Sequence, residues 1–138
     1  MNILFFLTPK ANCELLYDDE SIREALKRME ISGYAALPII SKEDGAYQGT
    51  LTDGDLLWAL KNRCKLDLKE AQEHSIMEIA HQKDYLPVSV STDISDLLQK
   101  ALDQNFVPVV DDRGTFIGIV TRKSILAQFI KNANEGKR

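Results

Sequence analysis

The sequence predicts an α+β protein made of two tandem β-α-β-β-α repeats. Three observations carry this prediction. An apolar strand pattern containing a proline occurs twice, around Pro38 and Pro108. Each is followed, after a polar turn, by a second strand pattern that ends in threonine, at Thr52 and Thr121. Amphipathic helical patterns flank both pairs of strands, so each repeat holds one ordered set of elements.

The elements of the two repeats follow from local signals. In the first repeat, the segment Asp18–Ser21 offers N-caps for a helix and Gly33 stops it. In the second, Thr92 and Asp93 offer the corresponding cap. Both hairpin turns contain a glycine. The expected elements are, in order, 14–17, 22–33, 35–40, 47–52 and 56–60, then 87–90, 94–102, 105–110, 116–121 and 125–130.

We divide the chain into repeat 1 (1–61), a connector (62–75), repeat 2 (76–132) and a frayed tail (133–138). The connector is polar and is expected to be partly helical, with Asp67 as a cap. One repeat alone is too small to cover both faces of its sheet. The two are therefore expected to pack together with pseudo-two-fold symmetry.

Composition narrows the class of function. The chain has 138 residues, of which 44% are hydrophobic and 28% charged, and its net charge is −4. This balance argues against a dedicated binder of DNA or RNA, although one helix terminus can still hold a small anion. Cys13 and Cys64 form no disulfide framework, and the apolar run 3–7 is too short for a membrane span. We expect a cytoplasmic protein with no membrane partner.

The segments around the two threonines resemble a known family. Gly49–Asp55 (GTLTDGD) and Gly118–Ser124 (GIVTRKS) are similar to the G-h-x-[ST]-x-x-D signature of the cystathionine β-synthase (CBS) domain. The proline strands 35–40 (AALPII) and 105–110 (NFVPVV) match that family as well. The resemblance covers nearly the whole chain as a tandem pair, the arrangement called a Bateman module.

The resemblance implies a non-catalytic regulatory module that binds an adenosine-containing ligand of the AMP, ADP or ATP class. S-adenosylmethionine and cyclic dinucleotides are alternatives in the family, and a ligand-free dimerisation scaffold is another. The implied ligand sites are two clefts between the repeats. Each cleft is lined by the threonine motif of one repeat and the pre-proline strand of the other. A homodimer and a separate effector protein are the implied partners.

The chemistry of the first threonine motif suits a ribose phosphate. Thr52 stands where a strand becomes a helix, and helix N-termini attract phosphate. Asp55 can accept hydrogen bonds from a ribose diol, and Gly54 leaves room for close approach. The same spacing also predicts a capping box that needs no ligand. Asp53 and Asp55 could hold Mg²⁺ only together with a nucleotide.

The second motif departs from the signature, because Ser124 replaces the aspartate and Arg122 follows Thr121. A serine offers one hydrogen bond and no charge, whereas Arg122 could meet a phosphate or remain a solvated surface charge. The two sites are therefore expected to be unequal.

The purine is expected to lie in an apolar slot with backbone polar groups at its edge. By position, the residues that would line or complete the slots are Tyr34, Ala35, Ala36, Asn105, Phe106, Lys10, His81 and Leu86. The segments around Lys10 and from His81 to Leu86 are expected to be extended. Phe106 could stack on a base, but a core role is the stronger expectation. Trp58 is expected in the core or at a dimer contact. No metal site or catalytic set is expected, and catalysis is the least favoured hypothesis.

Overall fold

The structure is a computed structural model that describes residues 2–80 and 85–136. The chain divides into two compact units. One is the continuous segment Glu14–Asp84, called here the continuous unit. The other joins Met1–Cys13 to Tyr85–Arg138 and is called the composite unit. The first thirteen residues therefore fold with the second half of the chain.

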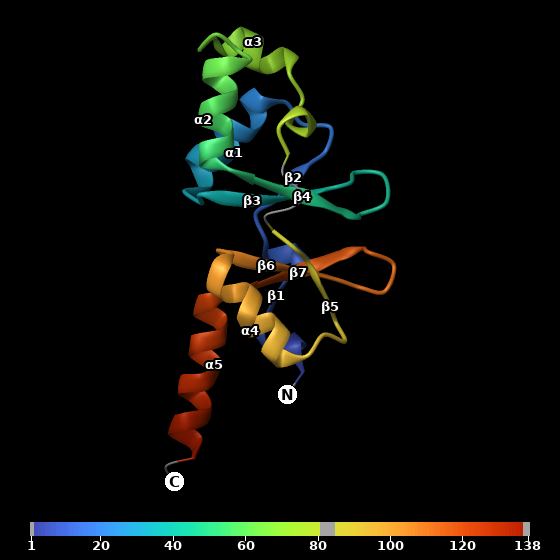
Figure 1. The fold of residues 1–138 in the computed structure, drawn as a ribbon, viewed down its shortest axis with the longest axis vertical. Helices are drawn as coiled ribbons and strands as arrows, with labels where there is room; N and C mark the ends of the chain where they lie inside the picture. Colours follow the sequence, from blue (N-terminus) through green and yellow to red (C-terminus); the bar gives the residue numbers. More distant parts are fainter. Residues whose placement is uncertain (1, 81–84, 137–138) are drawn as a thin grey trace. The chain divides into compact units, whose positions relative to one another are not determined.

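The continuous unit contains a three-stranded sheet in the order β2-β3-β4. Strand β2 is parallel to β3, and β3 is antiparallel to β4. Helices α1 and α2 cover one face of this sheet (Figure 1). The elements are β2 (Leu16–Tyr17), α1 (Ile22–Ser32), β3 (Ala36–Ile40), β4 (Tyr47–Thr52), α2 (Asp53–Asn62), α3 (Leu68–Glu73) and the 3-10 helix η3 (Ile76–Glu78).

Helix α1 begins and ends where the sequence predicts. The Ser21 hydroxyl accepts a hydrogen bond from the Glu24 backbone N–H at 3.1 Å, and the Glu24 carboxylate accepts one from the Ser21 backbone N–H at 3.4 Å. This reciprocal pair satisfies two of the N–H groups that a helix start leaves open. Gly33 ends the helix with φ 74°, a left-handed conformation that glycine adopts at little cost.

The composite unit contains a four-stranded sheet in the order β1-β7-β6-β5. It repeats the scheme of the continuous unit: β5 is parallel to β6, and β6 is antiparallel to β7. Its elements are the 3-10 helix η1 (Ile3–Phe6), β1 (Leu7–Pro9), the 3-10 helix η2 (Lys10–Asn12), β5 (Val88–Ser89), α4 (Ile94–Asp103), β6 (Phe106–Val110), β7 (Phe116–Thr121) and α5 (Arg122–Glu135).

The N-terminal segment completes the composite unit. Strand β1 pairs antiparallel with β7, with Pro9 opposite Gly118. A Cβ at Gly118 would collide with the Thr8 carbonyl oxygen and lie 3.1 Å from the Pro9 Cα, so only glycine permits this approach. Phe6 is 2% exposed, and its ring stacks on that of Phe129 at 6.3 Å between centroids. The N-terminal residues are thus part of the core of this unit.

Most of the expected elements are present, and three expectations need correction. The connector carries α3, with the Asp67 carboxylate accepting from the Lys69 N–H at 2.9 Å as predicted. The tail expected to fray from residue 133 is helical through Glu135, because α5 continues to that residue. Trp58 is 57% exposed, so of its two expected positions the core is wrong and the dimer contact stays a prediction. The expected extended segment around Lys10 is instead the 3-10 helix η2, closed by a Cys13 N–H bond to the Lys10 carbonyl at 3.0 Å.

Over the described ranges, every helix is too short or too polar to cross a lipid bilayer.

Candidate strand-to-helix ligand sites

The first candidate site is the junction of β4 and α2 in the continuous unit. Thr52 lies opposite Ala36 across the hairpin and is the N-cap of α2. Its hydroxyl accepts a hydrogen bond from the Asp55 N–H at 3.1 Å, and Asp55 Oδ2 accepts from the Thr52 N–H at 2.9 Å. The predicted capping box is therefore present, and it fixes the Asp55 carboxylate at the helix start.

The other N–H groups of this first helical turn also have partners inside the protein. Asp53 donates its N–H to the Ala35 carbonyl at 2.9 Å, and Gly54 donates its N–H to Asp53 Oδ1 at 2.8 Å. The Asp53 residue is exposed. A phosphate that approached this helix start would have to displace the Asp53 carboxylate from the Gly54 N–H and overcome its negative charge.

The second candidate site is the junction of β7 and α5 in the composite unit. Thr121 lies opposite Phe106 and caps α5. The Thr121 hydroxyl accepts from the Ser124 N–H at 3.1 Å, and Ser124 Oγ accepts from the Thr121 N–H at 3.2 Å. The two junctions thus share one geometry, but only the first presents a carboxylate.

Arg122 takes a position that neither sequence expectation described. Its Nε donates to the Ala101 carbonyl oxygen, and its Nη2 donates to the Leu102 carbonyl oxygen at 3.0 Å. These carbonyls belong to the last turn of α4, where a cation is favoured by the helix dipole. The guanidinium therefore ties α5 to the end of α4, and its expected contact with a phosphate stays a prediction.

The pre-proline residues of the continuous unit are largely open. Tyr34 is 58% exposed and Ala35 is exposed, whereas Ala36 is buried. Tyr34, Ala35 and Asp53 line a hollow of about 930 Å³ between α1, α2 and α3. The structure thus brings three of the predicted site residues to one hollow.

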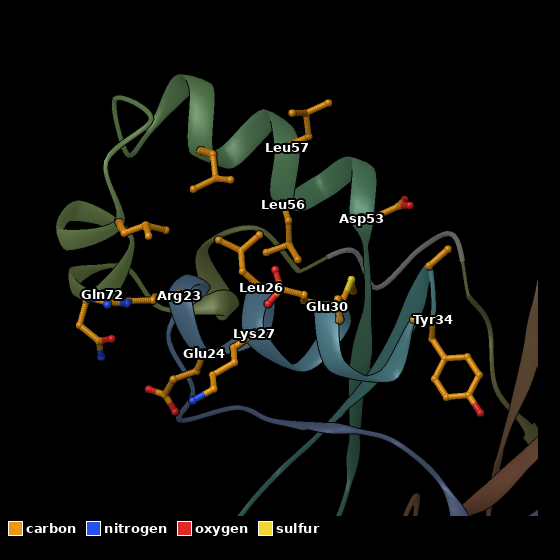
Figure 2. A pocket seen from close by; sticks show the side chains of 15 residues that line it. Arg23, Glu24, Leu26, Lys27, Glu30, Tyr34, Asp53, Leu56, Leu57 and Gln72 are labelled. Carbon is orange, nitrogen blue, oxygen red and sulfur yellow. The ribbon is translucent and has the colours of Figure 1, made fainter.

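The hollow has an apolar floor and charged ends. Figure 2 shows Arg23 and Gln72 toward one end and Tyr34 and Asp53 toward the other. The floor is formed by Leu26, Met29, Leu56 and Leu60. Glu24, Lys27 and Glu30 line the hollow between these ends, so its wall combines an apolar floor with charged side chains of α1.

The pre-proline residues of the composite unit are engaged with one another. Phe106 is 6% exposed and Tyr85 is 8% exposed, and their rings lie 5.0 Å apart. The Asn105 side-chain amide donates to the Tyr85 hydroxyl at 3.0 Å. Phe106 therefore has the core role that the sequence favoured.

Gln104 organises this region and was missed in the sequence. It is 5% exposed, its Oε1 accepts from the Leu86 N–H at 3.1 Å, and its Nε2 donates to the Leu86 carbonyl at 3.3 Å and the Phe106 carbonyl at 3.2 Å. The side chain thus bridges the exposed Leu86 to the start of β6. The available signal was a polar residue directly after an amphipathic helix and before an apolar strand.

The remaining candidates are less informative. His81 lies outside the described residues. Lys10 lies in η2, before Cys13, whose pKa is raised by burial of the thiol. Within 2–80 and 85–136, no group of three or more His, Cys, Asp or Glu side chains could hold a metal ion.

Comparison with known proteins gives the class of this protein. The family model described as the CBS domain matches residues 9–62 and 76–131. The chain therefore belongs to the CBS-domain family, with two CBS domains in tandem.

Solved structures agree with this assignment. A CBS domain protein from Streptococcus pneumoniae is 30% identical, with 93% of this chain and 86% of that chain covered and a TM-score of 0.81. CbpB, solved in complex with c-di-AMP, is 24% identical over 99% of this chain and 89% of its own, with a TM-score of 0.90. CBSX2, solved in complex with AMP, is 24% identical over 99% and 98%, with a TM-score of 0.73. The last two likenesses show the fold alone.

Proposed function

We propose that this chain is a non-catalytic regulatory module that binds an adenosine-containing ligand of the AMP, ADP or ATP class and signals to a separate protein. The observation that carries the proposal is the Thr52–Asp55 junction. There the Thr52 hydroxyl accepts from the Asp55 backbone N–H at 3.1 Å and the Asp55 carboxylate accepts from the Thr52 backbone N–H at 2.9 Å, so both side chains stand at a helix N-terminus. A ribose diol can exchange with these capping bonds, because a hydroxyl donates to a carboxylate and accepts from an N–H.

The junctions are proposed to differ in strength. Asp55 offers a charged acceptor, and hydrogen bonds to charged groups are about twice as strong as neutral ones. Ser124 offers a neutral hydroxyl that already donates to the Thr121 carbonyl at 2.9 Å. The junction of the continuous unit is therefore the main ribose site in this proposal. If ATP is the ligand, Asp53 and Asp55 would hold Mg²⁺ jointly with its phosphates.

A cyclic dinucleotide is the second candidate ligand. The observation that favours it is the TM-score of 0.90 to CbpB, a protein solved with c-di-AMP bound. AMP has a comparable observation in CBSX2, with a TM-score of 0.73. Both ligands present adenosine and phosphate, but the 3′ oxygens of a cyclic dinucleotide belong to its phosphodiesters, so it offers Asp55 only a 2′-hydroxyl where AMP offers a diol. S-adenosylmethionine shares the adenosine but lacks the phosphate.

We also propose a homodimer as the working form. The hollow between α1 and α2 has an apolar floor, and Leu57 on its rim is 57% exposed. Arg23, Glu24 and Lys27 lie on the first half of α1, which therefore carries a net positive charge, whereas Glu30 and Asp53 lie near its other end. Two copies of this face packed in antiparallel fashion would cover the leucines and join each basic end to an acidic end. Without a nucleotide response, the same dimer would be a scaffold.

Calorimetric titration tests the ligand proposal. The purified protein is titrated with AMP, ADP, ATP with and without Mg²⁺, S-adenosylmethionine and c-di-AMP. We expect saturable heat with at least one adenosine phosphate and weaker binding in the Asp55→Ala variant. No heat and no thermal shift with any of these ligands would leave the scaffold as the better account. A phosphate-release assay with ATP is expected to show no turnover.

Sedimentation analysis tests the dimer. We expect a mass of two chains for the native protein and one chain for Leu57→Asp, because a charge on the apolar rim would be buried without a partner. A native mass of one chain at micromolar concentration would contradict the dimer without affecting the ligand proposal.

A further inference from the structure

A second hollow lies on the other side of α2 from the one in Figure 2. Its volume is about 370 Å³, within the roughly 300–1,000 Å³ that small-molecule sites occupy. It lies between α2 and the segment that follows η3. Its lining includes Asp55, Trp58, Asn62, Arg63 and Glu78.

Helical periodicity places the key residues of this hollow on one face. Asp55, Trp58 and Asn62 follow one another at intervals of three and four residues, so they lie along one side of α2. Leu57, by contrast, lines the larger hollow. Asp55 therefore belongs both to the capping box and to the wall of the smaller hollow, and Trp58 stands one turn further along the same wall.

Trp58 is placed for contact with a ligand. It is the single tryptophan of the chain, and it is 57% exposed although tryptophan is usually well buried. The Lys61 ammonium lies 5.5 Å from the centre of its ring, a cation–π contact. A large aromatic face beside a hollow lined by a carboxylate, an amide and a guanidinium is an arrangement that can hold a planar, polar molecule.

We propose that Trp58 is the stacking platform for a base of the nucleotide ligand, and that the hollow beside it is the base-binding part of the site. The inference rests on the proposed function, which puts the ribose at Asp55. Cβ atoms three residues apart on a helix are about 5–6 Å apart, so one nucleoside can touch both side chains.

The surrounding charges fit a nucleotide. Lys61 lies beside the ring and Arg63 lines the hollow, and each can pair with a phosphate, while Asp55 and Glu78 are the carboxylates of the same hollow. Asn62 supplies a donor and an acceptor for a base edge or a sugar hydroxyl. Stacking tolerates every base, so Trp58 supplies affinity and the neighbouring polar groups supply selectivity.

Tryptophan fluorescence gives a direct test, because Trp58 is the only tryptophan. The ligand that binds most tightly in calorimetry is titrated into the full-length protein while the fluorescence is recorded. Stacking of a base on the indole is expected to quench the emission along the same saturation curve as the heat. As a control, the protein is diluted without ligand while its fluorescence is recorded. A change on dilution would show that dimer dissociation alters the surroundings of Trp58.

Three variants sharpen the test. Trp58→Ala is expected to weaken binding roughly 5- to 150-fold, the range set by loss of one base–aromatic stack. Trp58→Phe is expected to retain most of the affinity. Ile130→Ala is the matched control, since Ile130 is an apolar side chain of similar exposure at 61% and lies in α5, outside both hollows, and its affinity is expected to equal that of the native protein.

Two results would overturn the inference while the proposed function stands. One is saturable heat with unchanged fluorescence and native affinity in Trp58→Ala. The other is a fluorescence change that follows dilution and not ligand, which would make Trp58 a contact between copies. Absence of binding by the native protein would instead contradict the proposed function itself.

Discussion

Both units contain one β-α-β-β-α set, but two residues before the proline are open in one unit and two are buried in the other. In the continuous unit, Tyr34 and Ala35 are exposed at the edge of a hollow. In the composite unit, Gln104 and Phe106 are buried, and Gln104 bonds both backbone groups of Leu86. One pre-proline segment is thus open to partners outside the unit, and the other is held by its own neighbours.

The two strand-to-helix junctions show the same contrast between a group open to a ligand and groups bonded within their own unit. Asp55 brings a carboxylate to the start of α2, whereas the corresponding Ser124 and the adjacent Arg122 bond to carbonyl oxygens of their own unit. A repeated fold therefore does not imply a repeated site. The capping box forms with either aspartate or serine three positions after the threonine. The choice between these two residues is therefore available to set function.

The largest predicted effect tests the composite nature of one unit. Phe6→Ala is expected to destabilise it by about 3–5 kcal/mol, because a fully buried ring in contact with Phe129 is lost. Hydrogen exchange measured separately over 85–136 and 14–80 is expected to rise more in the first range. Leu16→Ala, in the core of the other unit, is the converse control. An equal rise in both ranges for Phe6→Ala would contradict the division.

Gln104→Ala is the next prediction. It removes three hydrogen bonds, of which the bond to the Phe106 carbonyl is buried and the two to Leu86 are partly buried, at a cost of about 1–3 kcal/mol in the free energy of unfolding. The counterpart on the open side, Tyr34→Ala, is expected to change stability by less than about 0.5 kcal/mol because the ring is exposed. Chemical denaturation measures both, and similar losses for the two variants would remove the proposed contrast.

The junctions are compared by Asp55→Ala and Ser124→Ala. Loss of the charged acceptor is expected to weaken nucleotide binding by about 10- to 100-fold, and loss of the serine hydroxyl by less than about 10-fold. Both variants also lose a capping bond worth about 1 kcal/mol, which thermal unfolding reports separately. Reduced stability with native affinity in Asp55→Ala would make the aspartate a cap alone.

The smallest effect concerns the two thiols. Burial raises the pKa of Cys13 and of Cys64, and Glu70 and Glu78 raise that of Cys64 further. The folded state thus favours the neutral thiols. Their contribution to the free energy of unfolding is complete at a pH below the unfolded-state pKa and is lost as the pH rises through the folded-state pKa. Alkylation near neutral pH is expected to be slow for both and slower for the fully buried Cys64. Faster reaction at Cys64 would contradict its burial.

Local signals predicted the repeats well. Glycine at Gly33 and the threonines at Thr52 and Thr121 act through backbone geometry within a few residues, so their positions can be read from the sequence. The spacing from Thr52 to Asp55 also predicted a capping box, and the structure contains one at both strand-to-helix junctions.

Long-range contacts could not be predicted in the same way. Nothing near Phe6 in the sequence shows that it packs beside Phe129, and the close approach at Gly118 depends on strand β1 from the other end of the chain. Gln104 likewise acts on Leu86, eighteen positions earlier. Trp58 was expected in the core or at a dimer contact, and only packing decides which face of α2 is covered.

A crystal structure of the protein grown with its tightest-binding adenosine phosphate tests the central claim most directly. The account predicts ribose hydroxyls within hydrogen-bond distance of the Asp55 carboxylate, with the Thr52 hydroxyl beside them. A nucleotide bound elsewhere, with the Thr52–Asp55 capping bonds untouched, would contradict it.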